Sequence, residues 1–474
     1  MPCLSVVLIL ILVVFLIVVL PVVLILVVLL IVILPVVPVL VVSAVLVILN
    51  VIHHHFSFSY FLRLLFSDQG HAIQYLLSIN LNGVNFMLIK NGKIFIMNGI
   101  TVENGCVLTK GRSIVQTDQF IDSSKNHDGI EIDARGCWVL PGLIESHCHI
   151  GISSEKTGAD GDDSNEVTMP VTPYIKAIDG INPMDAAFHN AIKAGITSVM
   201  IGPGSSNVVG GQFVFIKTDG RRLDDMIVKE PAAMKIAFGE NPKKNYGSNN
   251  LMPSTRMSIG AMLREELFYA KIYYEQKNAA EAKNEQFEVN PRRECWLPVF
   301  RKEIPLKAHV HRADDILTAI RIAKEYNLNL TLDHCTEGHL IASHIKESGF
   351  PAIVGPGLAS RNKVEIQYAD FKTAGELHHA GVKVAVTTDH PVSLIQYLPL
   401  CAGLAAKEGL GIDEGLKAIT INAAQICGVS DRLGSLCPGK DADIAVFDGN
   451  PMNTFTNCLY TIINGNIVYK SDKV

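Results

Sequence analysis

The stretch Pro141-Gly-Leu-Ile-Glu-Ser-His-Cys-His149 gives the first indication of fold and chemistry in this chain. It is a short, largely apolar run that ends in two histidines, His147 and His149, with a single residue between them. Successive side chains of a β-strand point to opposite faces, so two histidines at this spacing share a face, as two ligands of a metal ion must. A His-x-His pair alone is a weak signal, and its weight depends on further candidate ligands elsewhere in the chain.

Polar residues at the ends of later strand-like runs supply such candidates. They are His309 and His311, which repeat the spacing, then His334, and finally Asp389. A carboxylate directly after a buried strand is costly unless a cation accompanies it, so Asp389 is predicted to bind the metal. As the predicted catalytic residue, Asp389 would also accept a proton from the attacking water.

The segment Met234-Lys-Ile-Ala-Phe-Gly-Glu-Asn-Pro-Lys243 contains two candidates for a carboxylate that bridges two metal ions. Glu240 could bridge directly. Lys235 could do so after carbamylation, in which its amine takes up carbon dioxide. We prefer Glu240 because it lies where the strand ends, whereas Lys235 lies earlier and packing alone would explain it. Lys235 remains the alternative.

The order of strand and helix patterns predicts the fold class. Between residues 141 and 430, apolar strand-like runs alternate with helical patterns, which is typical of a parallel α/β arrangement. We expect a (β/α)8 barrel of the TIM type there, with a charged helical insertion at 241–303. Barrel enzymes place their active sites at the C-terminal ends of the strands, where the candidate ligands lie. Residues 87–140 and 431–474 contain short alternating segments, which predict small antiparallel strands.

The N-terminal part of the chain differs from the rest. Residues 1–52 contain no Asp, Glu, Lys or Arg and consist mostly of Val, Leu and Ile. This run is long enough for two membrane-spanning helices of about 20 residues each, so one interpretation is an apolar helical segment that acts as a transmembrane anchor. The alternative is a gene-model artefact, because a second start is available at Met87. Residues 53–86 are interpreted as a linker.

Composition limits the partners and the compartment. The net charge of −5 gives no support for nucleic-acid binding. The ten cysteines are scattered without a Cys-x-x-Cys pair, which favours a reducing compartment. We therefore expect a cytoplasmic catalytic domain with a small-molecule substrate, held at a membrane only if residues 1–52 are a real anchor. Association into a homo-oligomer is left open.

Over about residues 87–472, the chain resembles the amidohydrolase superfamily of metal-dependent hydrolases. The resemblance rests on the strand-end histidines, on Asp389, on Val139–His149 and on the closing segment Gly434-Ser-Leu-Cys-Pro-Gly-Lys-Asp-Ala-Asp-Ile444. Within the superfamily, the chain is most similar to the imidazolonepropionase-like and prolidase-like branch. The resemblance implies that the two terminal sets of strands form a small β-sandwich beside the barrel. It also implies hydrolysis of a C–N bond in an amide, a peptide-like substrate or a cyclic amide.

The expected metal site holds one or two divalent ions, with Zn2+ as the expected metal. The expected ligands are His147, His149 and Asp389 for one ion and His309 and His334 for the other, with Glu240 or carbamylated Lys235 between them. By the resemblance, the first histidine of the His309/His311 pair is the ligand, and His311 faces the substrate.

Two further residues are candidates for substrate binding. Arg312 could pair with a substrate carboxylate, although a salt bridge with Asp314 or Asp315 explains it equally. Asn207 belongs to the Gly- and Asn-rich loop Gly202–Gly211. That loop lacks the Gly-Lys-Ser/Thr ending of a phosphate loop, so we interpret it as a substrate-facing barrel loop.

One departure from the superfamily pattern bears on the reaction. Deaminases and imidazolonepropionases of the superfamily carry, next to the equivalent of His309, an acid that protonates a ring nitrogen. This chain has His309-Val-His-Arg312 instead, which counts against both activities and favours hydrolysis of an amide. A deaminase-type member of the superfamily and a non-catalytic scaffold with the same fold remain the alternatives.

Overall fold

The computed structural model describes residues 86–122, 129–154 and 161–474. The chain divides into two compact units, residues 1–83 and 84–474, and the described residues all belong to the second. The predicted N-terminal anchor and almost all of the predicted linker lie outside the described residues. Within those three ranges, no helix combines the length and the apolar character that crossing a membrane requires.

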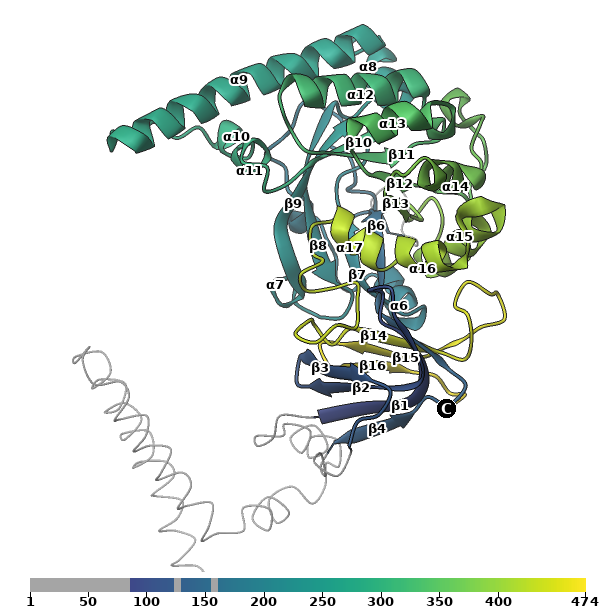
Figure 1. The fold of residues 1–474 in the computed structure, drawn as a ribbon. Helices are drawn as coiled ribbons and strands as arrows, with labels where there is room; N and C mark the ends of the chain where they lie inside the picture. Colours follow the sequence, from purple (N-terminus) through teal and green to yellow (C-terminus); the bar gives the residue numbers. More distant parts are fainter. Residues whose placement is uncertain (1–85, 123–128, 155–160) are drawn as a thin grey trace, which may run out of the picture. The chain divides into compact units, whose positions relative to one another are not determined.

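A nearly closed sheet of eight strands forms a TIM-like barrel (Figure 1). In spatial order its strands are β13 (Val384–Val386), β12 (Ala352–Val354), β11 (Leu330–His334), β10 (Leu306–Val310), β9 (Ile227–Ala237), β8 (Val209–Lys217), β7 (Ile196–Ile201) and β6 (Leu143–Cys148). Neighbouring strands run parallel except at β8, which is antiparallel to both β7 and β9. Apart from the first five residues of β9, the barrel strands are buried, as expected for a sheet covered on both faces.

The antiparallel strand β8 corrects the expectation of a regular (β/α)8 pattern. A parallel pair needs a long crossover connection, usually a helix, whereas residues 202–208 between β7 and β8 form only a short loop. Strands β7, β8 and β9 therefore form a meander within the barrel wall. Its first loop lies at the C-terminal end of β7, beside the strand ends that carry the candidate ligands.

Helices cover the outside of the barrel (Figure 1). The α-helices of the described residues are α6 (Ala186–Lys193), α7 (Leu223–Met226), α8 (Glu240–Gly247), α9 (Arg256–Lys283), α10 (Pro291–Glu294), α11 (Leu297–Phe300), α12 (Ala313–Glu325), α13 (Ala342–Ser348), α14 (Lys372–His379), α15 (Leu398–Ala405), α16 (Ile412–Ala418) and α17 (Ile421–Ile426). In α12, Ile316, Ile320 and Ala323 recur at helical spacing and are buried. Asp314 lies in the first turn, where a carboxylate stabilises the positive end of the helix dipole.

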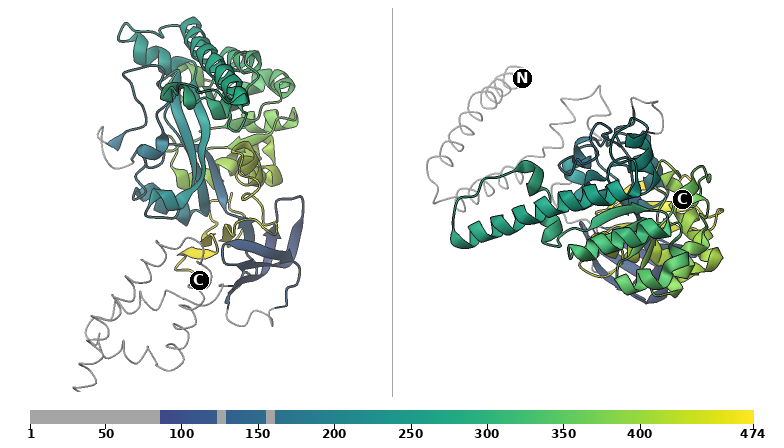
Figure 2. Two further views of the ribbon diagram at one scale, coloured as in Figure 1. Left: turned by 90° about the vertical axis from the view of Figure 1, so that its left-hand side faces the viewer. Right: turned by 90° about the horizontal axis from the view of Figure 1, so that it is seen from above.

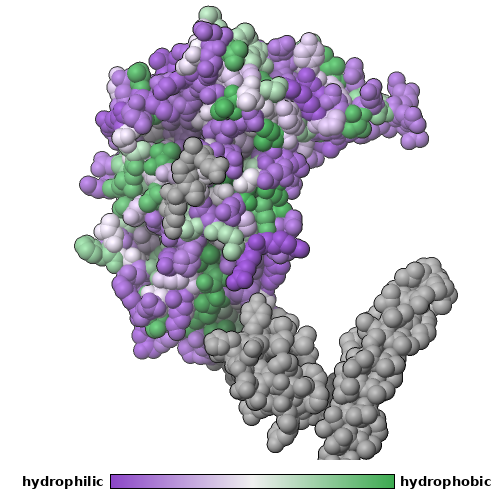
Figure 3. Space-filling view, turned by 180° about the vertical axis from the view of Figure 1, so that it is seen from behind, coloured by the Kyte–Doolittle hydropathy of each residue, from purple (hydrophilic) through white to green (hydrophobic). Residues whose placement is uncertain are grey.

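The predicted helical insertion corresponds mainly to α9. This helix begins with a capping box, in which the Thr255 and Ser258 side chains satisfy backbone N–H groups of the first turn. Leu263 and Leu267 pack on the barrel layer, while the far end extends away from it (Figures 1 and 2). Hydrophilic residues dominate that projecting end in Figure 3, which agrees with the predicted charged character of the insertion.

A second eight-stranded sheet is built from both ends of the described chain. Its strands, in order, are β16 (Asn466–Lys470), β15 (Cys458–Ile463), β14 (Ile444–Phe447), β5 (Trp138–Pro141), β1 (Phe86–Phe95), β2 (Thr101–Lys110) and β3 (Ser113–Asp118), with β4 (Ile130–Asp133) beside β1. Its buried residues, among them Ile89, Val107, Val139 and Ile444, form a core separate from the main core of the barrel. The antiparallel pairing of β14 with β5 joins the two ends.

A tight connection fixes this second sheet to the barrel. Gly142 alone separates β5 from β6, and a Cβ atom at Gly142 would lie 2.1 Å from Oγ1 of Thr197. Near this junction, the buried Lys217 ammonium of β8 forms an ion pair with Asp443 at 2.7 Å. The chain direction entering β6, and therefore the position of His147 at its end, is set by these contacts.

Candidate metal centre

Two groups of metal-binding side chains lie at the C-terminal ends of the barrel strands. The first group consists of His147, His149 and Asp389, from the end of β6 and the segment after β13. The second consists of His309, His311 and His334, from the ends of β10 and β11. Within each group, the candidate ligand atoms lie within 4.8 Å of one another. The rings of His147 and His334 are 5.2 Å apart between centroids, so the two groups are neighbours.

Asp389 lies between the two groups. Its Oδ1 is 3.3 Å from Nε2 of His149 and 3.5 Å from Nε2 of His147. Its Oδ2 is 4.0 Å from Nδ1 of His334. The backbone of Asp389 has a φ of 51°, in the left-handed region that Asp tolerates better than most residues. Its N–H donates to Oγ1 of Thr387, which helps to hold this conformation.

Backbone carbonyls orient two of the histidine rings. Nδ1 of His149 lies 2.7 Å from the Gly202 carbonyl, and Nδ1 of His334 lies 2.7 Å from the Gly355 carbonyl. A carbonyl can only accept, so in each ring Nδ1 carries the proton and Nε2 keeps its lone pair. Metal-ligating histidines in proteins are held in this way by a partner on the other ring nitrogen.

Two buried atoms at the centre fit a metal ion. Nε2 of His334 and Oδ1 of Asp389 are buried and accept no hydrogen bond within the described part of the chain. Buried polar atoms almost always have a partner, so two such acceptors on facing side chains need an explanation. Imidazole nitrogens together with a carboxylate oxygen are the donor set that Zn2+ prefers. The residues present therefore fit a divalent metal.

The protonation states are also those of metal ligands. Burial, followed by neighbouring positive charges, lowers the pKa of His147, His309 and His311 well below the usual value, so these rings are neutral at physiological pH. For Asp389, burial acts to raise the pKa, but the neighbouring His334 and His149 rings outweigh it and the pKa is lowered. Neutral imidazole and ionised carboxylate are the forms that bind metals.

The Lys235 side chain lies beside His147 of the first group. Its side chain is fully buried, and its Nζ is 3.4 Å from Nε2 of His147. A Cβ atom at Gly210 of β8 would approach Cγ of Lys235 to 3.1 Å, so this glycine makes room for the lysine. Burial lowers the pKa of Lys235 to about 8.

Glu240 occupies a different position. It is the first residue of α8, and its backbone N–H donates to Oε2 of Glu365 at 2.7 Å. Its carboxylate belongs to neither ligand group, and it forms no ion pair with another described residue. The structure thus brings Lys235, and not the preferred Glu240, next to His147.

Two residues of this centre were missed by the sequence analysis. Asp333 of β11 is fully buried, and its Oδ2 lies 2.8 Å from Nδ1 of His147. Its other oxygen accepts a hydrogen bond from Lys307 of β10 at 3.2 Å. Asp333 therefore fixes the His147 ring through the nitrogen that faces away from Asp389.

Glu145 of β6 was missed as well. Its fully buried carboxylate accepts from the His147 N–H at 3.1 Å, from the Thr387 hydroxyl at 2.5 Å, and from the Thr388 N–H at 2.9 Å and hydroxyl at 2.6 Å. Strands β6 and β13 are the two edges of the barrel sheet, and no backbone ladder joins them. Glu145 thus links the segments that carry His147 and Asp389.

A cavity of about 540 Å³ opens onto both ligand groups. A substrate-binding residue should line this cavity, so the three candidates can be compared with its lining residues. His311 lines it, and Nδ1 of His311 lies 2.7 Å from the Thr336 hydroxyl. Arg312 is not among the lining residues, because its guanidinium makes two hydrogen bonds to Asp314. Asn207 does not line the cavity either, since its amide bonds to Thr172 and Tyr246. For Arg312, the structural salt bridge is the interpretation that the geometry supports.

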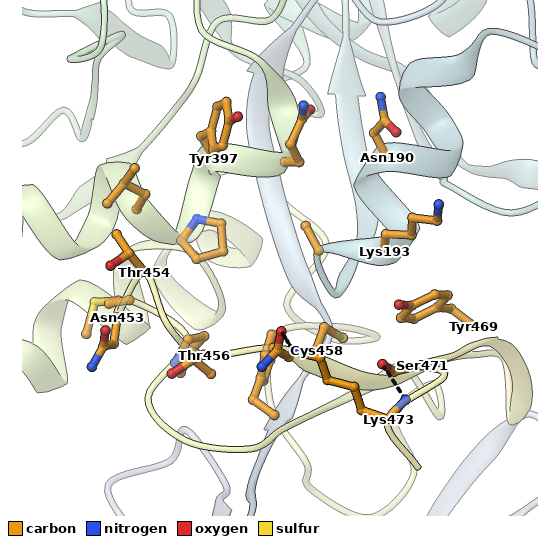
Figure 4. A pocket seen from close by; sticks show the side chains of 18 residues that line it. Asn190, Lys193, Tyr397, Asn453, Thr454, Thr456, Cys458, Tyr469, Ser471 and Lys473 are labelled. Atoms are coloured by element: carbon orange, nitrogen blue, oxygen red, sulfur yellow. Dashed lines mark hydrogen bonds between the residues drawn. The ribbon is translucent and has the colours of Figure 1, made fainter.

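A separate cavity of about 530 Å³ lies between α6 and the second sheet (Figure 4). Asn190 and Lys193 of α6 face Tyr469 and Cys458 of the sheet across it. Its described lining residues include no histidine and no carboxylate, and burial raises the pKa of the Cys458 thiol to about 12. It therefore lacks the histidine and carboxylate side chains that characterise the first cavity.

Known proteins with similar sequences or folds are amidohydrolases and related hydrolases. The model of the Amidohydrolase family matches residues 300–468. An amidohydrolase from Thermotoga maritima MSB8, known from its crystal structure, is 39% identical, with 81% of this chain and 100% of that chain covered and a TM-score of 0.78. A solved prolidase in complex with N-methylphosphonate-L-proline has a TM-score of 0.52 at 18% identity, which shows the shared fold alone.

Two curated relatives extend the comparison. The amidohydrolase tasK of Hapsidospora irregularis is 26% identical over 373 residues, which are 73% of this chain but only 38% of that protein. The imidazolonepropionase of Picrophilus torridus is 25% identical, with 76% of this chain and 91% of that protein covered. The family match, the similarity to the Thermotoga maritima protein and the strand-end ligand groups agree. The chain belongs to the amidohydrolase family and is a hydrolase of carbon–nitrogen bonds.

Proposed function

We propose that this protein is a metal-dependent amidohydrolase that cleaves an amide, a peptide-like bond or a cyclic amide in a small molecule. The observation that carries the proposal is the pair of ligand groups, His147/His149/Asp389 and His309/His311/His334, which share one cavity at the strand ends. When bound there, divalent metal ions such as Zn2+ would lower the pKa of a water molecule and polarise the scissile carbonyl. One or two ions are expected.

Asp389 is the proposed catalytic acid–base group. Its lowered pKa keeps the carboxylate ionised and ready to accept the proton of the attacking water. Its oxygens approach His149 at 3.3 Å and His334 at 4.0 Å, so the carboxylate can act at a substrate held between the two groups. After the C–N bond breaks, Asp389 gives the proton to the leaving nitrogen.

We propose Lys235, rather than Glu240, as the bridging residue. Carbamylation requires a neutral amine, and the buried Lys235 amine with a pKa of about 8 is partly neutral at physiological pH. The resulting carbamate would place carboxylate oxygens close to Nε2 of His147, which is 3.4 Å from Nζ. The Glu240 carboxylate would have to reach the centre from the start of α8.

Replacement of Asp389 by Asn tests the proposal. Metal-loaded protein is assayed against a panel of N-acyl amino acids, dipeptides and cyclic amides, with metal content measured by mass spectrometry. Loss of a general acid–base group lowers turnover by about 10²- to 10⁴-fold, and we expect the metal content to stay largely intact. The exposed Asp413→Asn serves as the matched control and keeps wild-type turnover. Unchanged turnover in Asp389→Asn would contradict the assignment, whatever its metal content.

A further inference from the structure

The cavity over the metal centre has a single cationic side chain on its described wall, Lys363. Lysine and arginine are otherwise absent from the described lining residues, and Asp389 is the one lining carboxylate. The remaining polar lining residues are uncharged apart from the histidines; among them are Asn165, Ser205 and Asn241. With Asp389 assigned to the metals, no described lining residue is left to neutralise Lys363.

The Lys363 ammonium has more hydrogen-bond donors than it has acceptors among the described residues. Its Nζ donates to Oδ1 of Asn241 at 2.6 Å. An ammonium group has three N–H donors, and this is the one hydrogen bond of Nζ to a described residue. The side chain is half-buried, and no described carboxylate lies within ion-pair distance. The charge of Lys363 acts on the buried Glu365 carboxylate, but the two side chains form no ion pair, so the ammonium remains able to pair with an anionic group that enters the cavity.

Lys363 is also close enough to the ligand groups to act on the same substrate. The Asn241 amide that accepts from Lys363 has its nitrogen 3.3 Å from Nε2 of His309 and donates to Ser205 at 2.7 Å. The amide of a single side chain therefore separates the ammonium from a proposed metal ligand.

We propose that Lys363 binds a carboxylate of the substrate, so that the substrates are N-acyl amino acids or dipeptides with a free carboxylate near the scissile amide. The inference rests on the proposed function and specifies the substrate class of the same site. A single ammonium flanked by neutral amide and hydroxyl groups suits a singly charged carboxylate, whereas a phosphate would need more positive charge. Leu358, Ile366 and Val392 also line the cavity, which suits an amino acid with an apolar side chain.

Substrate pairs that differ only in this charge test the proposal. Release of acetate is measured from N-acetyl-L-leucine and from N-acetyl-L-leucinamide, with the metal-loaded enzyme. For the wild type, kcat/KM should be about tenfold or more higher for N-acetyl-L-leucine than for N-acetyl-L-leucinamide. A ratio of this size corresponds to one hydrogen bond between charged groups. Lys363→Gln should bring the ratio close to one, and Lys363→Arg should retain part of it. The exposed Lys407→Gln is the matched control and keeps the wild-type ratio.

A ratio that stays at the wild-type value in Lys363→Gln would overturn the inference, and so would a wild type without preference. If Lys363 only held Asn241 in place, the variant would lose rate on both substrates equally and the ratio would persist. That result also counts against the proposal.

A binding measurement separates this inference from the proposed hydrolysis. Calorimetry on Asp389→Asn, with and without Lys363→Gln, compares the affinities for the same two compounds without turnover. A roughly tenfold preference for the carboxylate that is lost in the Lys363→Gln background supports the inference. This holds even if the wild type hydrolyses neither compound. Absence of hydrolysis would by itself count against the proposed function. Hydrolysis without any carboxylate preference overturns the inference and leaves the proposed function intact. Binding of neither compound, without hydrolysis, counts against both.

Discussion

Replacement of Glu145 by Gln should weaken both the fold and the metal centre, because Glu145 joins the two edges of the barrel sheet. Its carboxylate accepts four hydrogen bonds, one from His147 and three from Thr387 and Thr388. These hydrogen bonds cross a gap where β6 and β13 share no backbone ladder. His147 is itself a proposed ligand, and Thr387 and Thr388 directly precede the proposed ligand Asp389.

The size of the effect follows from the hydrogen bonds that a carboxamide cannot accept. Glutamine keeps one acceptor oxygen but turns an NH2 group towards donors that had faced an oxygen, so about two of the bonds to a charged acceptor disappear. Such bonds contribute about 1.5–3 kcal/mol each, but the uncharged side chain also avoids the burial penalty that raises the pKa of Glu145. We expect a net loss of about 3 kcal/mol, which lowers Tm by about 4 °C for a unit of this size.

Differential scanning fluorimetry of the metal-free protein measures this shift, and chelator competition measures the Zn2+ affinity. The affinity should fall by about 10- to 100-fold, as found when residues that orient metal ligands are replaced. Glu103→Gln is the matched control: Glu103 lies on β2, is exposed and pairs with Lys93, so its Tm should change by less than about 1 °C. A metal-free Tm for Glu145→Gln that equals that of the control would show that these hydrogen bonds do not stabilise the barrel.

Two further predictions concern Lys235 and Arg312. With a pKa of about 8, the Lys235 amine is about one-tenth neutral at pH 7 and about nine-tenths neutral at pH 9. Because only the neutral amine takes up carbon dioxide, activation of metal-free protein by Zn2+ at a fixed CO2 concentration should be about tenfold faster at pH 9 than at pH 7. Activation that needs no CO2 would argue against the carbamate. Arg312→Ala should change kcat/KM by less than about threefold, since Arg312 is partly exposed and pairs with Asp314; a loss beyond about tenfold would restore Arg312 as a substrate-binding residue.

Local patterns were enough to predict the strand ends. Each candidate histidine follows a buried run of the kind that forms a covered strand, and parallel strands of a barrel bring their C-terminal ends to one rim. His147, His309 and His334 could therefore be expected to meet before the fold was known. The hydrophobic pattern carries no strand direction, however, so the antiparallel course of β8 was not predictable from its apolar sequence.

Contacts between segments far apart in the chain could not be predicted from the sequence. The preference for Glu240 over Lys235 assumed that the strand ends beside the site. Strand register places Lys235 opposite Lys307 on β10, in the buried interior, and the sequence does not reveal that register. Asp333 meets His147 across the barrel, and nothing near either residue in the sequence indicates that partner. Asn207 lies in the predicted loop, yet its amide turns to Thr172, because loop conformation and not loop composition decides which side chains face the cavity.

The proposed metal-dependent hydrolysis can be tested by removing the metal and restoring it. The protein is stripped with a chelator, its metal content is verified by mass spectrometry, and hydrolysis of the N-acyl amino acid and dipeptide panel is followed during titration with Zn2+. We predict no hydrolysis by the stripped protein and recovery that is complete by about two equivalents, one for each ligand group. Full hydrolysis by protein that contains no metal would show that the reaction does not depend on the proposed metal centre.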